Sequence, residues 1–208
     1  MHKTETGQLT LAIESAIAGG SLSLIRGETE IASWTGSADR SKAEELLVNI
    51  AEMLLSVGVS RSDIGLIAVS AGPGSFTGIR IGIATALGLK TGLGIPMSSV
   101  SALEAIRRTS GSLPVGGGIT VAVPVGRNAI CIQAFKNGSA SGDPRTVPND
   151  DFGELLHDAS TFVLHRILFE KYGSRPNTID FGANIAYAIG LAGSPGVIAE
   201  PLFISKTF

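Results

Sequence analysis

The sequence has a single cysteine, Cys131, among its 208 residues. One cysteine excludes an internal disulfide and any zinc site built from several cysteines. The three histidines, His2, His157 and His165, do not have the His-x-x-x-His spacing that puts two imidazoles on one face of a helix. The sequence therefore predicts no metal site in this chain.

Charged residues are also scarce, at 16% of the chain, and the formal net charge is −2. Without an excess of basic residues, strong binding of nucleic acid by this chain alone is not expected. No apolar run reaches the roughly 18 residues that a membrane-spanning helix needs, and the sequence shows no signal peptide. We therefore expect a cytoplasmic protein without a membrane partner.

Glycine is abundant, with 27 residues, but it has no period, which excludes a collagen-like chain. The most informative cluster is the stretch Gly72-Pro73-Gly74-Ser75-Phe76-Thr77-Gly78. The apolar run 66–70 before it is typical of a buried strand, and Ser75 or Thr77 can cap a helix after it. We expect that helix to end before Gly94.

Small residues form two rows along this predicted helix. The first row is Gly78, Gly82 and Ala86, and the second is Ala84, Gly88 and Gly92. The two rows lie roughly 120° apart around the helix axis. Each interior glycine costs roughly 1 kcal/mol relative to alanine, and close packing of another backbone can offset that cost. We therefore predict that the helix is packed on more than one side, with another chain as one of its neighbours.

The remaining pattern predicts an α/β fold of two related lobes. A boundary rich in glycine and proline at 111–118 divides the chain into lobes 1–110 and 111–208. Ser41 and Ser101 are each followed three residues later by glutamate, the spacing of a capping box. In the first lobe we expect strands at 9–13, 21–25, 29–34, 66–70 and 96–100 and helices at 42–57, 77–93 and 101–108. In the second we expect strands at 119–123, 129–135, 161–164 and 202–205 and helices at 152–158 and 185–191. The order in the first lobe is that of a ribonuclease-H-like lobe, and the second lobe partly repeats it.

The stretch 71–86 closely resembles the signature of the TsaB (YeaZ) family. The resemblance extends to 94–96 and 100–104, and the segments 11–15, 44–47 and 201–204 are similar to further parts of that family. It implies an actin-like (ASKHA) fold and a role in making N6-threonylcarbamoyladenosine (t6A) at position 37 of tRNAs that read ANN codons.

The resemblance also implies that the chain is a non-catalytic subunit. Members pair with a homologous, metal-binding transferase, TsaD, and with a small ATPase, TsaE, and they form homodimers through helices of the first lobe. It implies contact with tRNA only through the complex and no cofactor in this chain, with ATP or ADP left open at the interface with the partner. We assign no catalytic residue.

Two sets of candidate site residues follow from the motif and the predicted helices. The interface candidates are Leu47, Ile50, Leu54, Gly78, Arg80, Gly82 and Ala86. The candidates near a nucleotide are Glu14, Ser15, Gly72, Gly74 and Ser75. Arg80 is either the contact of an acidic group on a partner or a solvated charge.

The chain departs from the family pattern at three places. Glu14 stands where members usually carry aspartate, Lys42 where histidine is frequent, and Pro124-Val125-Gly126 where Asp-Ala-Arg is frequent. The loop 72–78 also lacks the Gly-Lys-Ser/Thr ending of a P-loop. These departures fit a partner subunit better than an active site.

Two alternatives are kept. A stand-alone ASKHA phosphotransferase or nucleotide hydrolase is suggested by the fold and by Glu14. An M22-type glycoprotease-like peptidase is the older label of the wider family. The absence of a metal-binding pair or a catalytic triad in the sequence argues against the peptidase.

Overall fold

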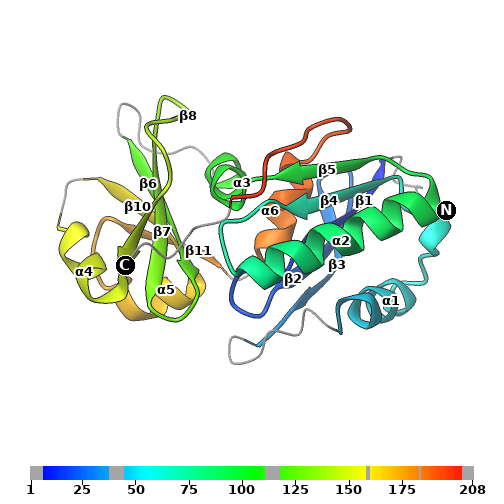
Figure 1. The fold of residues 1–208 in the computed structure, drawn as a ribbon, viewed down its shortest axis with the longest axis horizontal. Coiled ribbons are helices and arrows are strands. Elements are labelled where there is room, and N and C mark those ends of the chain that lie inside the picture. The colour runs from blue at the N-terminus through cyan, green and yellow to red at the C-terminus, as the bar shows by residue number, and fades with distance from the viewer. Residues whose placement is uncertain (1–6, 38–44, 111–117, 158–159, 183, 203–208) are drawn as a thin grey trace.

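The computed structural model describes residues 7–37, 45–110, 118–157, 160–182 and 184–202. Two β-sheets dominate this part of the chain, and two helices, α3 (Ala102–Thr109) and α6 (Ile185–Ala192), lie between them (Figure 1). The predicted α/β fold of two lobes is confirmed.

The first sheet contains five strands in the order β3-β2-β1-β4-β5. Its central strand β1 is antiparallel to β2 and parallel to β4, and β5 is parallel to β4. All residues of β1 and β4 are buried, because helices cover both faces of the sheet. The strand bounds are β1 (Leu9–Glu14), β2 (Ser21–Arg26), β3 (Thr29–Thr35), β4 (Leu66–Ser70) and β5 (Met97–Val100).

Helices α1 (Leu46–Ser56) and α2 (Phe76–Leu93) cover one face of this sheet, and α6 packs on the other face against β1, β2 and β4. Helix α1 starts at Leu46, later than expected, and the capping box predicted at Ser41 lies outside the described residues. A capping box occurs instead at Ser60, which starts the short 3-10 helix η2 (Arg61–Asp63).

The second sheet has the order β11-β10-β6-β7-β8, and β9 also pairs with β7. Its centre repeats that of the first sheet, because β6 is antiparallel to β7 and parallel to β10, and β10 is parallel to β11. The strands are β6 (Ile119–Val125), β7 (Ala129–Lys136), β8 (Ser139–Ala140), β9 (Arg145–Pro148), β10 (Thr161–His165) and β11 (Thr178–Gly182), with helices α4 (Asn149–Leu155) and α5 (Arg166–Tyr172). We did not predict β8, β9, α5 and β11. Of the strand predicted at 202–205, only Leu202 is among the described residues, and it is not in a strand.

The last described segment, residues 184–202, returns to the first lobe. Helix α6 packs on the first sheet, and the segment after it pairs with β5 through a parallel bridge between Ile198 and Ser99. These residues lie in the predicted second lobe by sequence but in the first lobe by packing. Cys131 is buried in the core between the sheets, where burial raises the pKa of its thiol to about 12.

Within the described ranges, no helix combines the length and the apolar character that crossing a membrane requires.

Candidate functional site

Helix α2 starts and ends as the sequence predicts. Ser75 is the N-cap, and its hydroxyl oxygen accepts a hydrogen bond of 3.3 Å from the N–H of Gly78. Gly94 ends the helix in the left-handed conformation, with φ of +67°, which glycine adopts without steric cost. The motif therefore fixes the position of this helix against β4.

The central loop, residues 71–75, is held by other parts of the same chain. Four hydrogen bonds between main-chain groups, each 2.8 Å long, tie it to the β1–β2 turn, to the β5–α3 junction and to the C-terminal segment. The N–H of Ala71 donates to the carbonyl oxygen of Val100, and that of Ala102 donates to Gly72. The N–H of Ser75 donates to Ala16, and that of Leu202 donates to Ala71. The loop is thus a junction at which four segments meet.

Glu14 ends strand β1 beside this junction and is almost completely buried. Its Oε1 accepts hydrogen bonds from the N–H groups of Ala16 (2.6 Å) and Ile17 (3.0 Å). Burial raises the pKa of this carboxyl to about 8, and the two backbone hydrogen bonds oppose that rise without cancelling it. At neutral pH the group is therefore mostly a neutral acid, which is a poor metal ligand.

No group of three or more His, Cys, Asp or Glu side chains within the described residues is placed to hold a metal ion.

The candidates near a nucleotide do lie together, but several of their polar groups are hydrogen-bonded to neighbouring residues of the same chain. The hydroxyl of Ser15 donates to the carbonyl oxygen of Gly78 at 2.8 Å, and the N–H of Gly72 donates to Ser70 Oγ at 3.1 Å. A Cβ atom on Gly74 would come within 2.6 Å of Ala16. The arrangement is a packed contact between the end of β1 and the start of α2.

The first row of small residues does not face a partner, so this part of the predicted interface is corrected. A Cβ atom on Gly78 would collide with the main chain of Ser15, and one on Gly82 would collide with its hydroxyl. Ala86 is fully buried in the core under α1 and α2. The row lets α2 approach the chain's own β1–β2 turn and sheet.

Two of the α1 candidates need the same correction. Ile50 and Leu54 are each 3% exposed and belong to the core between the helices and the sheet. Leu47, the third candidate on this helix, is instead 58% exposed. The three candidates therefore combine two core positions with one surface position.

The second row of small residues lies on the exposed side of α2. Ala84, Gly88 and Gly92 are exposed, and a Cβ atom on either glycine would meet nothing within 4 Å. Phe76 is 55% exposed at the start of the helix, with the guanidinium carbon of Arg80 5.2 Å from its ring centroid. This side of α2 is flat in the middle and carries an aromatic–arginine pair at one end.

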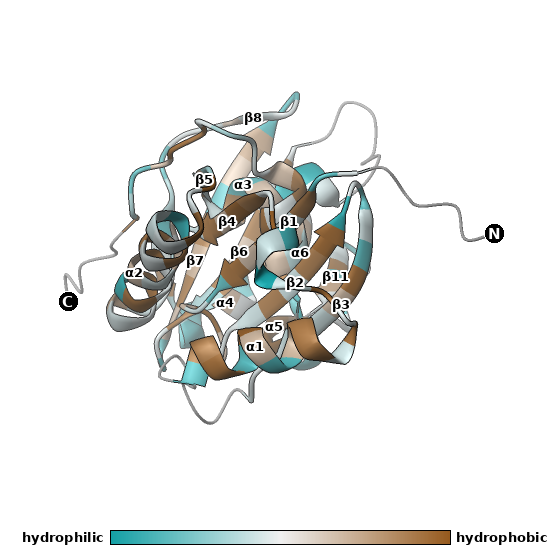
Figure 2. Cartoon of the chain, turned by 90° about the vertical axis from the view of Figure 1, so that its right-hand side faces the viewer, coloured by the Kyte–Doolittle hydropathy of each residue, from teal (hydrophilic) through white to brown (hydrophobic). Residues whose placement is uncertain are grey.

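Exposed apolar side chains concentrate on these two helices. Ten large apolar side chains are exposed in the described part of the chain, and six of them lie on α1, its C-cap or α2. Figure 2 shows apolar segments alternating with hydrophilic ones along the α1 ribbon. We call the exposed side of both helices the outer helical face; its members are Leu47, Val48, Leu55, Phe76, Arg80, Ala84, Leu87 and Gly88.

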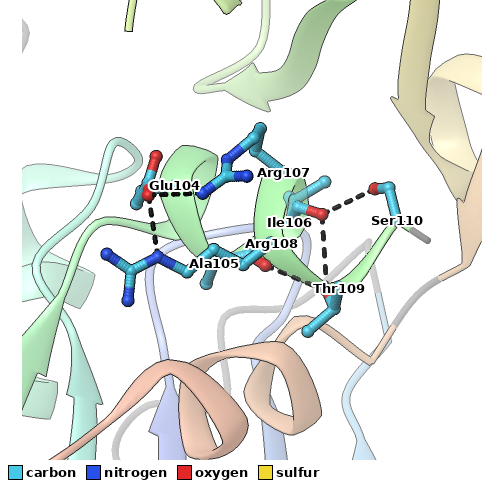
Figure 3. Close-up of polar contacts among 7 residues, drawn as sticks. All are labelled: Glu104, Ala105, Ile106, Arg107, Arg108, Thr109 and Ser110. Carbon is cyan, nitrogen blue, oxygen red and sulfur yellow. Dashed lines mark hydrogen bonds and ion pairs between the residues drawn. The ribbon is translucent and has the colours of Figure 1, made fainter. Parts of the chain in front are cut away.

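A charged cluster lies on α3, between the two sheets (Figure 3). Glu104 Oε1 accepts from Arg107 Nη2 at 3.0 Å and from Arg108 Nε at 2.7 Å. Partial burial raises the pKa of Glu104, but the two arginines outweigh that effect and hold it below its usual value. Ser101 is the N-cap of α3 without a side-chain cap bond, so the capping box predicted here is wrong.

A cavity of about 670 Å³ opens at the amino-terminal ends of β1 and β4. Its lining includes Gln8, Leu66, Arg108 and Tyr187. Glu14 and the central loop lie at the carboxyl ends of the same strands. The cavity is therefore at the opposite end of these strands and is separate from the motif.

The sequence matches the model of one protein family over residues 36–141, just over half of the chain, and that family is described as TsaD, tRNA N6-adenosine threonylcarbamoyltransferase. The tRNA threonylcarbamoyladenosine biosynthesis protein TsaB of Escherichia coli K12 is 39% identical over 93 residues, which are 45% of this chain and 40% of that protein. The TsaB protein of Haemophilus influenzae is 30% identical over 148 residues, which are 70% of this chain and 58% of that protein. The matched segments thus span about half the length of these relatives.

Solved structures agree on the fold. YeaZ from Pseudomonas aeruginosa superposes with a TM-score of 0.65 at 22% identity, covering 95% of this chain and all of that one. Component A of the (R)-2-hydroxyglutaryl-CoA dehydratase of Acidaminococcus fermentans superposes with a TM-score of 0.54 at 11% identity, covering 89% and 97%. At these identities the likeness shows the fold alone, and the predicted two-lobed ASKHA fold is confirmed.

Proposed function

The chain belongs to the TsaB (YeaZ) family, and on that premise we propose that it is a non-catalytic subunit of the machinery that makes t6A in tRNA. It binds a TsaD-like transferase through the outer helical face, and that partner supplies the metal and the reacting groups. A TsaE-like ATPase joins the same complex. The tRNAs that read ANN codons contact this chain only within the assembly.

The observation that carries this proposal is the concentration of exposed apolar side chains on α1 and α2. Leu55 is 81% exposed, and Leu47 and Val48 are 58% and 57% exposed. Exposed apolar surface of this kind marks protein interaction sites more often than single exposed apolar residues do. The outer helical face therefore fits an apolar surface on a partner protein.

Phe76 and Arg80 are of the residue types that contribute most to such interfaces. Aromatic residues and arginine are enriched among the residues that contribute most to binding. Stacking on the ring holds the Arg80 guanidinium in place, and its N–H groups suit a carboxylate on the partner. We therefore assign Arg80 to an acidic partner group, the first of its two predicted roles.

The contacts at the end of β1 support the non-catalytic part of the proposal. Burial raises the pKa of Glu14 to about 8, which disfavours its carboxylate form near pH 7. The hydroxyl of Ser15 and the N–H of Gly72 are bonded within the chain, to Gly78 and to Ser70. We propose that the chain alone binds no nucleotide and that any ATP or ADP binds where the partner completes the site.

The same face offers a homodimer contact when the partner is absent. Two copies related by a twofold axis would each cover the exposed leucines of the other. The partner and the second copy then compete, so the homodimer should dissociate as the TsaD-like subunit is added.

A rescue experiment tests the proposed function. Cells depleted of their own TsaB would express this chain together with its TsaD-like partner, and t6A in bulk tRNA would be measured by mass spectrometry. We expect the wild-type chain to restore t6A and the double variant Leu47→Asp/Leu87→Asp to fail, because two carboxylates would be buried in an apolar contact.

Ile167→Asp is the matched control. Ile167 is exposed and is the second residue of α5, just as Leu47 is the second residue of α1. The control should restore t6A fully. Rescue by the double variant at the wild-type level would remove the outer helical face from the proposal, and failure of the wild-type chain would contradict the function itself.

A further inference from the structure

The segment 194–202 lies along β5, the edge strand of the first sheet, and we call it the C-terminal strap. Ser99 binds it through both of its main-chain groups, donating to the carbonyl of Val197 and accepting from the N–H of Ala199, each at 2.9 Å. The hydroxyl of Ser99 adds a bond of 2.7 Å to the carbonyl oxygen of Ala199. One serine therefore provides three hydrogen bonds to the strap.

The side chains of the strap contribute little to this attachment. Ile198 is 67% exposed and Val197 is 43% exposed, and residues 194–196, Glu200 and Pro201 are exposed as well. Because little apolar surface is buried, main-chain hydrogen bonds hold the segment. Segments with few buried apolar contacts open locally at low free-energy cost.

The strap ends at the central loop. The N–H of Leu202 donates to the carbonyl oxygen of Ala71 at 2.8 Å. Gly72 lies so close that a Cβ atom on it would be 3.0 Å from the carbonyl oxygen of Leu202, and its φ is +92°. The strap thus contacts the loop immediately before Ser75, the N-cap of α2.

We propose that the C-terminal strap is a latch that fixes the central loop and, through it, the first turn of α2. When the strap is bound, Ala71 is held both by the strap and by β5, and α2 starts from a fixed point. When the strap opens, the Leu202 bond is lost and the first turn of α2 becomes mobile. Two segments more than 100 residues apart in sequence are coupled in this way.

The latch has a consequence for partner binding, which rests on the proposed function. Phe76 and Arg80 lie in the first turns of α2, so their positions depend on how firmly the central loop is held. A closed strap presents them to the partner in one arrangement. Opening the strap should weaken partner binding without altering any residue of the outer helical face.

Two neighbouring serines of β5 allow a matched test by hydrogen–deuterium exchange on the isolated full chain. Ser99→Ala removes the hydroxyl bond to the strap. Ser98→Ala is the control, since Ser98 is also buried but its hydroxyl has no hydrogen-bond partner among the described residues. We expect Ser99→Ala to speed exchange about fivefold in the strap and in residues 71–79, as loss of one hydrogen bond predicts, and Ser98→Ala to change neither.

A chain that ends after Gly193 is the stronger variant. It should exchange still faster in residues 71–79, while β2 exchanges as in the wild type. Unchanged exchange at 71–79 in both variants would overturn the proposal and leave the strap as a cover for the β5 edge. If the shortened chain unfolds, the pair of serine variants decides.

Partner affinity is measured separately by titration with the TsaD-like subunit. Ser99→Ala should weaken binding by up to about fivefold and Ser98→Ala should leave it unchanged, because only the first variant lowers the fraction of chains with a closed strap. Equal affinities would contradict the coupling to the outer helical face. If the wild-type chain does not bind, the proposed function fails, and the exchange result still stands for the latch.

Discussion

The hydroxyl oxygen of Ser15 lies where a side chain on Gly82 would begin. One turn earlier, the carbonyl oxygen of Gly78 accepts the hydrogen bond of that same hydroxyl. The end of β1 is thereby pressed against the main chain of α2. The glycines of the motif serve this internal contact, and larger residues at Gly82 or Ala86 would disturb the fold itself.

The same substitution on opposite sides of α2 should therefore have opposite effects on stability. Gly78→Ala forces a Cβ atom into the main chain of Ser15, and we expect it to lower the free energy of unfolding by about 1–3 kcal/mol. Gly88→Ala meets open space and should raise it by up to about 1 kcal/mol, because alanine favours the helix. Denaturant unfolding of the two variants measures both values, and equal effects would contradict the inward orientation of the first row.

Glu14→Gln should change how stability depends on pH. The folded-state pKa of about 8 lies above the ordinary value of 4.5, so the wild type loses stability as pH rises from about 4.5 to about 8. Glutamine can accept the same two hydrogen bonds and does not ionise. We expect the variant to match the wild type near pH 4 and to be more stable at pH 8 by on the order of a few kcal/mol. Thermal unfolding across this range checks it; parallel curves would show that Glu14 does not titrate as inferred.

Arg80→Ala should separate binding from folding. Arg80 is exposed, and its guanidinium lies over the exposed ring of Phe76. We therefore expect its loss to change the free energy of unfolding by less than about 0.5 kcal/mol. Affinity for the TsaD-like partner should fall by about 1–2 kcal/mol, the size typical of an arginine that contributes strongly to an interface. Arg127→Ala, at an exposed turn of the second lobe, is the control and should bind as the wild type does. Normal binding by Arg80→Ala would return Arg80 to its other predicted role, a solvated charge.

Local signals predicted the first lobe well. Helix α2 could be predicted because its signals are local. The apolar run of β4 precedes it, Ser75 caps its start and Gly94 ends it. The orientation of α2 could not be predicted in the same way. Both rows on the helix consist of small residues, so neither is marked as the core side, and only the position of Ser15 distinguishes them.

The second lobe was harder to predict, because its elements are short and capped in unusual ways. Helix α5 begins after His165, whose ring nitrogen Nδ1 accepts from the N–H of Ile167 at 3.3 Å, and histidine is not among the usual N-cap residues. Strand β11 follows as a run of five residues, partly buried, without clear alternation. The strap escaped prediction because its main chain makes the contacts, and main-chain bonding leaves no side-chain pattern.

The central claim is that the outer helical face binds the TsaD-like subunit, and titration calorimetry of purified proteins tests it most directly. The wild-type chain and Ile167→Asp should bind with equal affinity. Leu47→Asp/Leu87→Asp should bind at least 100-fold more weakly, since burying two carboxylates in an apolar contact costs roughly 3 kcal/mol or more. Equal affinity of all three proteins would contradict the claim.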